Sequence, residues 1–374
     1  MSLNRNIYAH LLQFVRELKK TLNEGLCYSS GEKRGYPRAV RLCVFLVPQV
    51  VHFTSGTGNV SLNFQDIWMK AKYLIGLLLA VLILVVLSSY ILAYLVVYPS
   101  QSVRAGWPQK LADWNMDETT TPLSRHQLVY EDVELYAEDG LRISAWYIPS
   151  VNSQKAIISF HGGNTDRRFF LDAVKEWHQA GFNVLMLDYR NHGLSGIDDA
   201  GLTFGQNESR DGIAAVDWLT KQKSIQSIGL IGASLGSATA LLTADKSTQV
   251  IAIILQSTGY NFAQLYNNVM PSLPNYFAYN AARMMLWLTG VAAADAWNLR
   301  YPMTVAAARL TIPAMFIHGG QDTIVHADEA MELYEMMPGG KEFWLIQSMG
   351  HEPATDKDPL RYPQKVAQFF NEYL

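Results

Sequence analysis

The stretch 227–240, SIGLIGASLGSATA, constrains the fold more than any other part of the sequence. An apolar run at 228–231 is followed directly by GASLG at 232–236 and then by a stretch of small residues that is expected to be helical. This order predicts a strand, a sharp turn and a helix, with Ser234 at the tip of the turn. A residue at such a tip has strained backbone, so its neighbours two positions away must lack side chains. Ser234 is therefore a candidate nucleophile, although a serine in an ordinary Gly-rich turn would give the same letters.

A regular alternation of strands and helices surrounds this turn and favours a mostly parallel sheet covered by helices on both faces. Ahead of it, 129–136 and 141–148 alternate polar and apolar residues about Asp139-Gly140, which predicts an antiparallel hairpin. The further predicted strands are 156–160, 184–187, 227–231, 250–255, 314–317 and 342–346, and the predicted helices are 167–180, 208–222, 236–246, 327–336 and 360–373.

The segment 257–310 interrupts this alternation and is rich in Tyr, Met, Trp, Asn and Ala. An insertion at the carboxyl edge of a sheet is where a helical cap over a substrate site would lie. An ordinary helix pair with a long loop is the alternative. Its larger side chains indicate either a lipophilic substrate or simple core packing, and they include Phe262, Tyr266, Met284, Met285 and Trp287.

The run 73–97 carries no charged residue and is rich in Leu, Ile and Val. As a helix it would extend about 37 Å, enough to cross a hydrocarbon core of about 30 Å. We expect one transmembrane helix, with Tyr94 and Tyr98 near one interface. The low charged content of the whole chain, 17%, agrees with a membrane part. Lys70 and Lys72 beside the helix favour an N-terminus inside, with the later chain on the non-cytoplasmic side.

The region 1–68 allows two interpretations. Apolar residues recur at helical spacing before Gly25, which predicts a short amphipathic helix, whereas the apolar run within 38–52 is too short to span a bilayer. Alternatively, Met69 followed by two lysines and the apolar run is typical of the start of a signal anchor, and 1–68 would then precede the true start. After the membrane helix, 98–127 is expected to be a tether, and 128–374 the main domain.

Composition argues against several classes of function. The net charge of -3 and the absence of a basic block argue against nucleic-acid binding. Both cysteines, Cys27 and Cys43, precede the apolar run, which excludes thiol catalysis, a cysteine zinc site and an internal disulfide in the later chain. The nine histidines show no metal-ligand spacing. We expect neither a metal nor a cofactor.

Two later segments offer the partners that a nucleophilic serine needs. The predicted strand 314–317 leads into a loop with Asp322, and the next predicted strand leads into a loop with His351. The order Ser234, Asp322, His351, with a helix and a strand between the last two, predicts nucleophile, orienting acid and base. A lone surface Asp or His would be unremarkable, but both follow strands in the expected order.

The sequence HGGN at 161–164 follows another predicted strand. Its small residues would let the backbone N–H of Gly163 face the site, with the N–H of Leu235 as a second donor. Two such donors form an oxyanion hole, each stabilising the developing charge by about 2.7 to 4 kcal/mol. A tight turn chosen for backbone freedom alone is the alternative.

Residues 128–374 resemble the α/β-hydrolase superfamily, serine esterase/lipase branch, and within it single-pass membrane-anchored hydrolases; the domain is also similar to the prolyl-oligopeptidase catalytic domain. This resemblance implies an α/β-hydrolase fold with Ser234 as nucleophile, His351 as base and Asp322 as orienting acid. It further implies structural roles for Asp188 and Arg190. The motifs that carry it are HGGN at 161–164, DYRNHGLSG at 188–196, GASLG at 232–236, HGGQDTIV at 318–325 and GHE at 350–352, while Ser237 departs from the second glycine of many relatives.

The expected function is therefore that of a membrane-anchored serine hydrolase acting on a small-molecule or lipid-like ester, thioester or related acyl bond through an acyl-enzyme. A serine peptidase is the first alternative, although the sequence leaves no room for a large propeller gate. An acyltransferase would use the same three residues. A non-catalytic membrane-tethered scaffold on the same fold is the alternative from a different class.

Overall fold

The computed structural model describes residues 50–55, 58–98, 111–272, 274–297, 299–351 and 353–374. The chain divides into two units, Met1–Leu74 and Ile75–Leu374. The helix expected before Gly25 lies outside the described residues. Ahead of the apolar helix, β1 (Val50–Ser55) and β2 (Gly58–Asn63) form an antiparallel hairpin.

The apolar run is helical, as predicted. Helix α2 (Phe64–Val97) includes Met69–Val97, a stretch long and apolar enough to cross a membrane. From Met69 to Leu84 the side chains are exposed, whereas burial on one face begins at Ser89. That α2 spans a bilayer stays a prediction.

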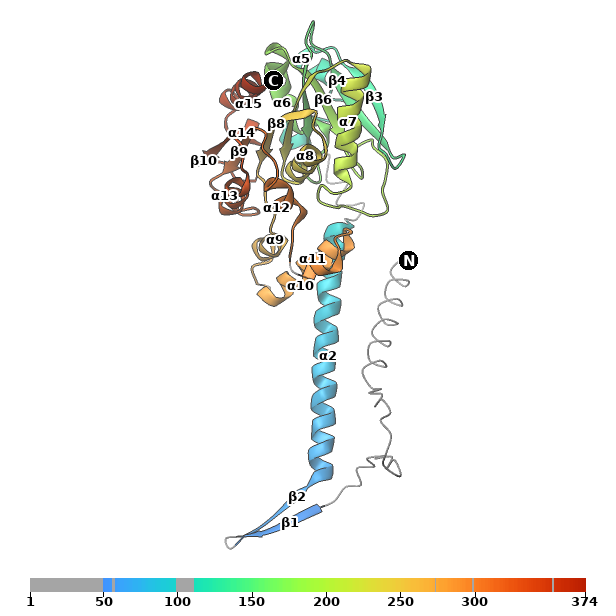
Figure 1. The fold of residues 1–374 in the computed structure, drawn as a ribbon, viewed down its shortest axis with the longest axis vertical. Coiled ribbons are helices and arrows are strands. Elements are labelled where there is room, and N and C mark those ends of the chain that lie inside the picture. The colour runs from blue at the N-terminus through green and yellow to red at the C-terminus, as the bar shows by residue number, and fades with distance from the viewer. Residues whose placement is uncertain (1–49, 56–57, 99–110, 273, 298, 352) are drawn as a thin grey trace, which may run out of the picture. The chain divides into compact units, whose positions relative to one another are not determined.

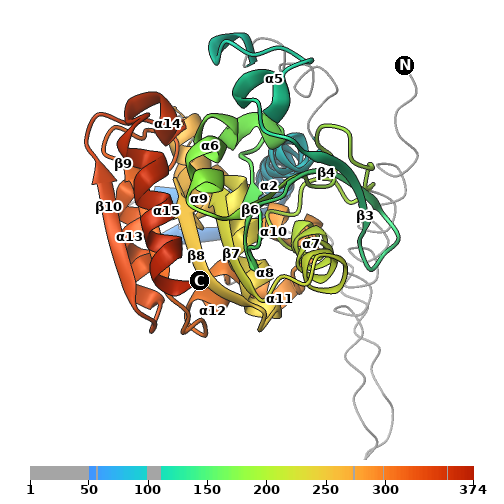
Figure 2. The ribbon, with the colours of Figure 1, turned by 90° about the horizontal axis from the view of Figure 1, so that it is seen from above.

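The second unit is built on a sheet of eight described strands in the order β10-β9-β8-β7-β5-β6-β4-β3 (Figure 2). The pairs β3–β4 and β4–β6 are antiparallel and the remaining pairs are parallel. The predicted parallel sheet with an antiparallel entry hairpin is confirmed. Its strands are β3 (Glu131–Tyr136), β4 (Arg142–Ile148), β5 (Lys155–Phe160), β6 (Asn183–Asp188), β7 (Ser227–Ala233), β8 (Val250–Gln256), β9 (Ala314–Gly319) and β10 (Lys341–Ile346).

Helices cover both faces of this sheet, because alternate strand residues are apolar toward each side. On one face, buried residues such as Ala215, Leu241 and Leu333 join the strands in a single apolar cluster. On the other face, buried residues such as Val174 and Phe370 join the strands in a second apolar cluster. The first face carries α7 (Glu208–Gln222), α8 (Leu235–Lys246), α12 (Pro302–Ala307) and α13 (Ala327–Met336), and the second carries α6 (Leu171–Gln179), which follows the short helix η1 (Arg167–Phe170), and α15 (Arg361–Tyr373).

The insertion 257–310 is helical, with α9 (Phe262–Val269), α10 (Asn275–Leu288), α11 (Ala293–Trp297) and α12 in succession (Figure 1). Phe262, Tyr266 and Met285 are buried in its own apolar cluster, whereas Trp287 is exposed. For the buried side chains, the core interpretation therefore fits better than a direct role in binding a substrate. Whether the insertion acts as a cap stays a prediction.

The described part of the expected tether, 111–127, packs against the sheet domain. Leu111 and Met116 are buried in the same apolar cluster as α6 and α15. In α5 (Pro122–His126), Arg125 forms an ion pair with Asp172 of α6 at 2.9 Å. Residues 111–127 therefore pack against the sheet domain.

Candidate active site

The turn after β7 has the strained geometry that its sequence predicts. Ser234 has φ 52° and ψ -116°, a left-handed conformation that is rare for a residue with a side chain. A Cβ on Gly232 would lie 2.1 Å from the carbonyl oxygen of Gly236, and one on Gly236 would lie 2.1 Å from that of Phe160. Both glycines are therefore required by close approach of backbone to backbone.

The turn is also tied to the neighbouring strand. The backbone N–H of Ser234 donates to the carbonyl of Gln256 at 2.9 Å, at the end of β8. Ser237 is buried, and its hydroxyl lies 2.8 Å from both the Gly232 and the Gln256 carbonyl oxygens. The serine that departs from the family pattern thus links the first turn of α8 to the ends of β7 and β8.

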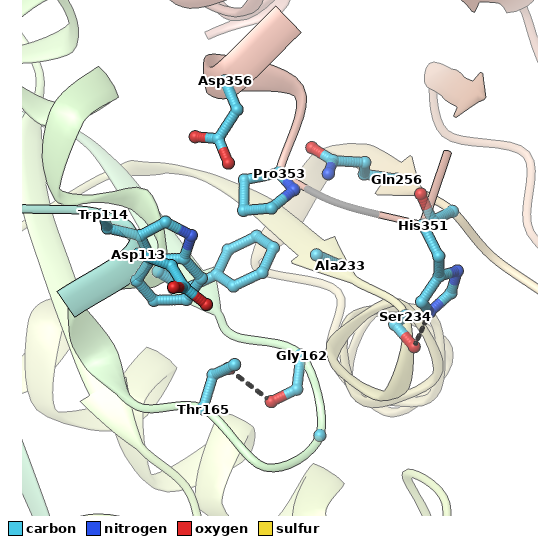
Figure 3. A pocket seen from close by; sticks show the side chains of 13 residues that line it. Asp113, Trp114, Gly162, Thr165, Ala233, Ser234, Gln256, His351, Pro353 and Asp356 are labelled. Carbon is cyan, nitrogen blue, oxygen red and sulfur yellow. Dashed lines mark hydrogen bonds between the residues drawn. The ribbon is translucent and has the colours of Figure 1, made fainter. Parts of the chain in front are cut away.

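The three side chains singled out in the sequence lie together at the carboxyl ends of the strands. His351 Nε2 lies 3.0 Å from Ser234 Oγ, and His351 Nδ1 lies 2.7 Å from Asp322 Oδ2 (Figure 3 shows the first contact). Ser234 follows β7, Asp322 follows β9 and His351 follows β10, which are held side by side with β8 in one sheet. With the carboxylate as acceptor, Nδ1 donates its proton and Nε2 is left to accept one from the serine.

The environment of Asp322 keeps its carboxyl ionised. Burial alone would raise the pKa of Asp322, but the hydrogen bond and charge of His351, with the N–H of Val325, hold it below its usual value. Asp322 Oδ1 accepts from the backbone of Ile324 at 3.0 Å and of Val325 at 2.9 Å. These bonds orient one carboxylate oxygen and leave the other for His351.

A second histidine lies behind the acid. His318 is buried at the end of β9, and its Nε2 lies 3.0 Å from the carbonyl of Val325 and 3.5 Å from Asp322 Oδ2. Burial lowers the pKa of His318, so that the ring is neutral at physiological pH. Because the His318 ring is neutral, it does not neutralise the charge of Asp322, and that charge acts on His351.

The loop after β5 lies beside the first turn of α8. A Cβ on Gly163 would be 3.7 Å from the Leu235 side chain, so the two predicted donors belong to adjacent segments. Thr165 donates to the Gly162 carbonyl at 2.7 Å, and the Tyr189 hydroxyl donates to the His161 carbonyl at 3.1 Å. These two hydrogen bonds restrain the start of the loop. That the N–H groups of Gly163 and Leu235 bind an oxyanion stays a prediction.

A pocket of about 350 Å³ opens beside Ser234 and His351. Trp114, Asp113 and Asp356 lie on its side away from the serine (Figure 3). Trp114 packs edge-on to Phe169, with ring centroids 5.7 Å apart. Among the described residues of the insertion 257–310, only Ser257 lines this pocket; the complete lining is Asp113, Trp114, Gly162, Gly163, Thr165, Phe169, Ala233, Ser234, Gln256, Ser257, His351, Pro353 and Asp356.

Sequence reasoning missed the wall of this pocket opposite the serine. Asp113 and Trp114 belong to the expected tether, and Asp356 belongs to α14 (Ala354–Lys357), which follows the histidine loop. No local pattern marks these residues, because they reach the pocket only when the tether folds back onto the sheet. Trp114, a large aromatic residue shortly before the predicted start of the domain, was the one feature of the sequence that could have indicated this wall.

Asp188 and Arg190 have the structural roles that the resemblance implied. Asp188 pairs with Arg167, and Arg190 pairs with Asp211 at 2.7 Å, all four side chains being buried. Burial opposes ionisation of Asp188, but Arg167 reverses the effect and holds the pKa of Asp188 below its usual value. These pairs fix the loop after β6 and contribute no atom to the lining of the pocket.

In the part of the chain that the structure describes, no three His, Cys, Asp or Glu side chains are grouped so as to hold a metal ion. The expectation of a reaction without a cofactor stays a prediction.

Comparison with known proteins identifies relatives of the sheet domain. The family described as "Serine aminopeptidase, S33" matches residues 151–306. The alpha/beta hydrolase domain-containing protein WAV2 of Arabidopsis thaliana is 30% identical over 220 residues, which are 56% of this chain and 68% of WAV2. An uncharacterized membrane protein of Saccharomyces cerevisiae is 24% identical over 280 residues, 74% of this chain and 88% of the yeast protein.

Among solved structures, an esterase of Pyrococcus furiosus has a similar fold. Its TM-score is 0.55 at 24% identity, and the match covers 68% of this chain and 95% of the esterase. At this level of identity the likeness concerns the fold alone.

Proposed function

The chain belongs to the α/β-hydrolase superfamily, and from this premise we propose that it is a membrane-anchored serine hydrolase that cleaves an ester, thioester or related acyl bond. The observation that carries the proposal is the continuous chain of hydrogen bonds from Ser234 through His351 to Asp322. A serine in a strained turn, within 3.0 Å of a histidine nitrogen that a buried carboxylate orients, is the arrangement that nucleophilic catalysis needs.

In the proposed reaction, Ser234 Oγ attacks the carbonyl carbon of the substrate while His351 Nε2 takes the hydroxyl proton. The bond to the leaving group then breaks, and His351 returns the proton to that group. A water molecule, deprotonated by the same nitrogen, attacks the acyl-enzyme and releases the carboxylic acid and the serine. Asp322 stabilises the imidazolium that forms in each half of the reaction.

The negative charge that develops on the carbonyl oxygen requires donors close to Ser234. The backbone N–H groups of Gly163 and Leu235 are proposed to supply them, since a Cβ on Gly163 would lie only 3.7 Å from the Leu235 side chain and the two segments are therefore adjacent. Each donor of this kind typically contributes about 2.7 to 4 kcal/mol to transition-state stabilisation.

The pocket supports a substrate of small to moderate size that is not an anion. Its volume of about 350 Å³ lies near the lower end of the range for small-molecule sites. Trp114 and Phe169 provide apolar contact, whereas the carboxylates of Asp113 and Asp356 would repel a negatively charged acyl group. Neutral or cationic acyl compounds are therefore the proposed substrates.

A second candidate is hydrolysis of an amide next to a free amine. The matching family is described as a serine aminopeptidase, and the two carboxylates of the pocket favour a positively charged group. The same three residues would catalyse this reaction. The two candidates differ in the substrate that the pocket accepts and in the leaving group.

Anchoring in the membrane is proposed from α2, whose apolar stretch Met69–Val97 is long enough to cross a bilayer. The name of the yeast relative as a membrane protein supports this. Lys70 and Lys72 lie at the N-terminal end of this stretch, just before the uncharged run 73–97, and we propose on this ground that the hydrolase domain lies on the non-cytoplasmic side.

The test is labelling of the detergent-solubilised full chain by a fluorophosphonate probe. We expect labelling of the native protein and of Ser247→Ala, and none of Ser234→Ala. Labelling that persists in Ser234→Ala would refute the assignment, and no labelling of folded native protein would favour a non-catalytic scaffold. A panel of acyl esters and amino-acyl anilides then separates the esterase from the aminopeptidase.

A further inference from the structure

The last turns of α2 have two different faces. Ser89, Ala93 and Val97 recur every fourth residue and are 1%, 0% and 0% exposed. On the opposite face, Leu87, Ile91 and Leu95 are 40%, 56% and 62% exposed. Residues at this spacing lie on one stripe of a helix. One side of this section of α2 is therefore covered by the rest of the hydrolase unit, and on the other side leucine and isoleucine side chains are exposed.

The insertion supplies the cover. Ala93 and Val97 belong to the same apolar cluster as residues of α9, α10 and α11, among them Ala278, Ala282 and Met285 of α10. The end of α2 and the insertion thus form one packed body within the second unit (Figure 1).

The end of α2 is also held by the loop before α7. The backbone N–H of Leu202 donates to the Val97 carbonyl at 2.8 Å. Gly201 has φ 75°, and a Cβ there would lie 2.5 Å from that carbonyl oxygen and 2.8 Å from the ring of Tyr98. These contacts therefore hold the C-terminal end of α2 in a fixed position against the loop before α7.

The length of α2 decides where this body lies. The part of the apolar run that precedes the buried stripe, 73–88, extends about 24 Å as a helix, whereas the hydrocarbon core of a bilayer is about 30 Å thick. If α2 spans the bilayer with the uncharged run 73–97 in the hydrocarbon and the two lysines outside it, part of the section packed against the insertion must therefore lie within the hydrocarbon. The exposed leucine and isoleucine side chains of that section agree with contact with lipid.

The insertion has the chemistry of a membrane-contacting surface. Between positions 259 and 299 its only charged residues are Arg283 and Asp295. Arg283 lies over the Trp297 ring at 4.9 Å, and Asp295 pairs with Arg300 at 3.3 Å. The exposed large side chains of these helices, counting Met270 directly after α9, are those of Val269, Met270, Tyr276, Tyr279, Trp287 and Trp297.

We propose that the exposed surface of α9, α10 and α11, defined by those six residues, lies in the interfacial layer of the same bilayer that α2 crosses. Aromatic residues are enriched at that depth because their rings are amphipathic. The lipid bilayer is the proposed occupant, since the insertion shares an apolar cluster with the last turns of α2 and has only two charged residues between positions 259 and 299. The inference rests on α2 being a membrane anchor, as proposed above, and adds a second contact that fixes the orientation of the hydrolase on the membrane.

The experiment measures the depth of single fluorescent labels in the full chain reconstituted into phosphatidylcholine vesicles. Cys27 and Cys43 are replaced by serine, and one cysteine is introduced for an NBD label. The test positions are Val269→Cys in α9 and Tyr276→Cys in α10, both more than half exposed. Leu82→Cys, in the middle of α2, reports spanning, and the exposed Val151→Cys is the matched control on the hydrolase unit.

We expect labels at 269 and 276 to be quenched by lipids carrying a nitroxide near the headgroup. Their quenching by aqueous iodide should be several-fold weaker than that of the label at 151. Equal iodide quenching at 269, 276 and 151 would overturn the inference and, with lipid quenching at 82, leave the anchor intact. Protection from iodide without quenching by lipid would also overturn it, because a protein would then cover the surface.

Loss of lipid quenching at position 82 would overturn both this inference and the membrane anchor. Fluorophosphonate labelling of the same cysteine variants tests the hydrolase separately, since none of these positions lies in the pocket. The failure of the proposed chemistry and the failure of the membrane contact therefore have different readouts.

Discussion

The carboxyl edge of the sheet and the insertion α9–α11 lie in the same unit but are held by different forces. At the sheet edge, Ser234, His351 and Asp322 are fixed by directional hydrogen bonds of 2.7 to 3.0 Å. In the insertion, small and apolar side chains such as Ala282 and Met285 pack together in one apolar cluster.

This difference predicts how each region responds to substitution. Directional bonds fail when one atom is removed, so the sheet edge should lose activity abruptly while remaining folded. Apolar packing depends on volume and on the absence of charge, so the insertion should tolerate similar side chains and fail when a charge is buried.

The largest effect is expected from the histidine of the site. His351→Ala removes the proton acceptor and should lower kcat by about 10⁶-fold, whereas Asp322→Asn should cost about 10⁴-fold because the imidazole remains. Steady-state kinetics on an activated ester measures both. Asp328→Asn, an exposed acid on α13, is the control, and an Asp322→Asn variant with native turnover would remove the carboxylate from the proposed mechanism.

The next effect concerns the backbone of the turn. Gly236→Ala forces a Cβ to within 2.1 Å of the Phe160 carbonyl oxygen, so the turn or the sheet must move. We expect destabilisation of about 3 kcal/mol, a fall in Tm of about 6 to 12 °C, and loss of fluorophosphonate labelling. Gly340→Ala is the matched control because nothing lies within 4 Å of its added carbon. Equal Tm values for the two variants would contradict the close approach.

The insertion should respond to charge rather than to the loss of a hydrogen bond. Ala282→Asp places a carboxylate in the apolar cluster of α9–α11 and should cost about 3 kcal/mol or more locally. We expect faster proteolysis within the insertion while Ser234 is still labelled. Asn275→Asp, at the exposed start of α10, is the control. Simultaneous loss of labelling and of protease resistance would show that the two regions are not independent.

The smallest effect is a pH dependence at the junction of the two regions. Glu329 of α13 is buried, and burial, with the charges of Glu332 and Asp322, raises its pKa from 4.5 to about 7, although an N–H of Asn261 opposes the rise. Between these two values the folded state binds more protons than the unfolded state, so stability falls as pH rises through this window.

The Tm of Glu329→Gln should therefore fall less between about pH 5 and about pH 8 than the Tm of the native protein. Thermal unfolding at both pH values measures the difference. Glu335→Gln, an exposed residue of the same helix, should follow the native pH dependence. A native-like pH dependence in Glu329→Gln would assign the effect to another group.

Much of the sheet could be predicted because its signals are local. Strands β5 to β10 are short apolar runs separated by helical segments, and the hairpin β3–β4 follows from alternation about Asp139-Gly140. Ser234 could be identified because the strained turn itself demands glycine on both sides. The insertion was less predictable, since its apolar residues suit either a cap or a packed helix pair.

The sequence by itself determined the order of elements, the strained serine turn, the apolar helix and the three residues that meet at the sheet edge. Each of these depends on local spacing or on the rule that parallel strands end at one edge. Only the tertiary structure decided that Trp114 would line the pocket and that Ala93 and Val97 would pack against the insertion. These contacts join segments far apart in the chain, and their energy is non-directional apolar burial, which leaves no spacing pattern in the sequence.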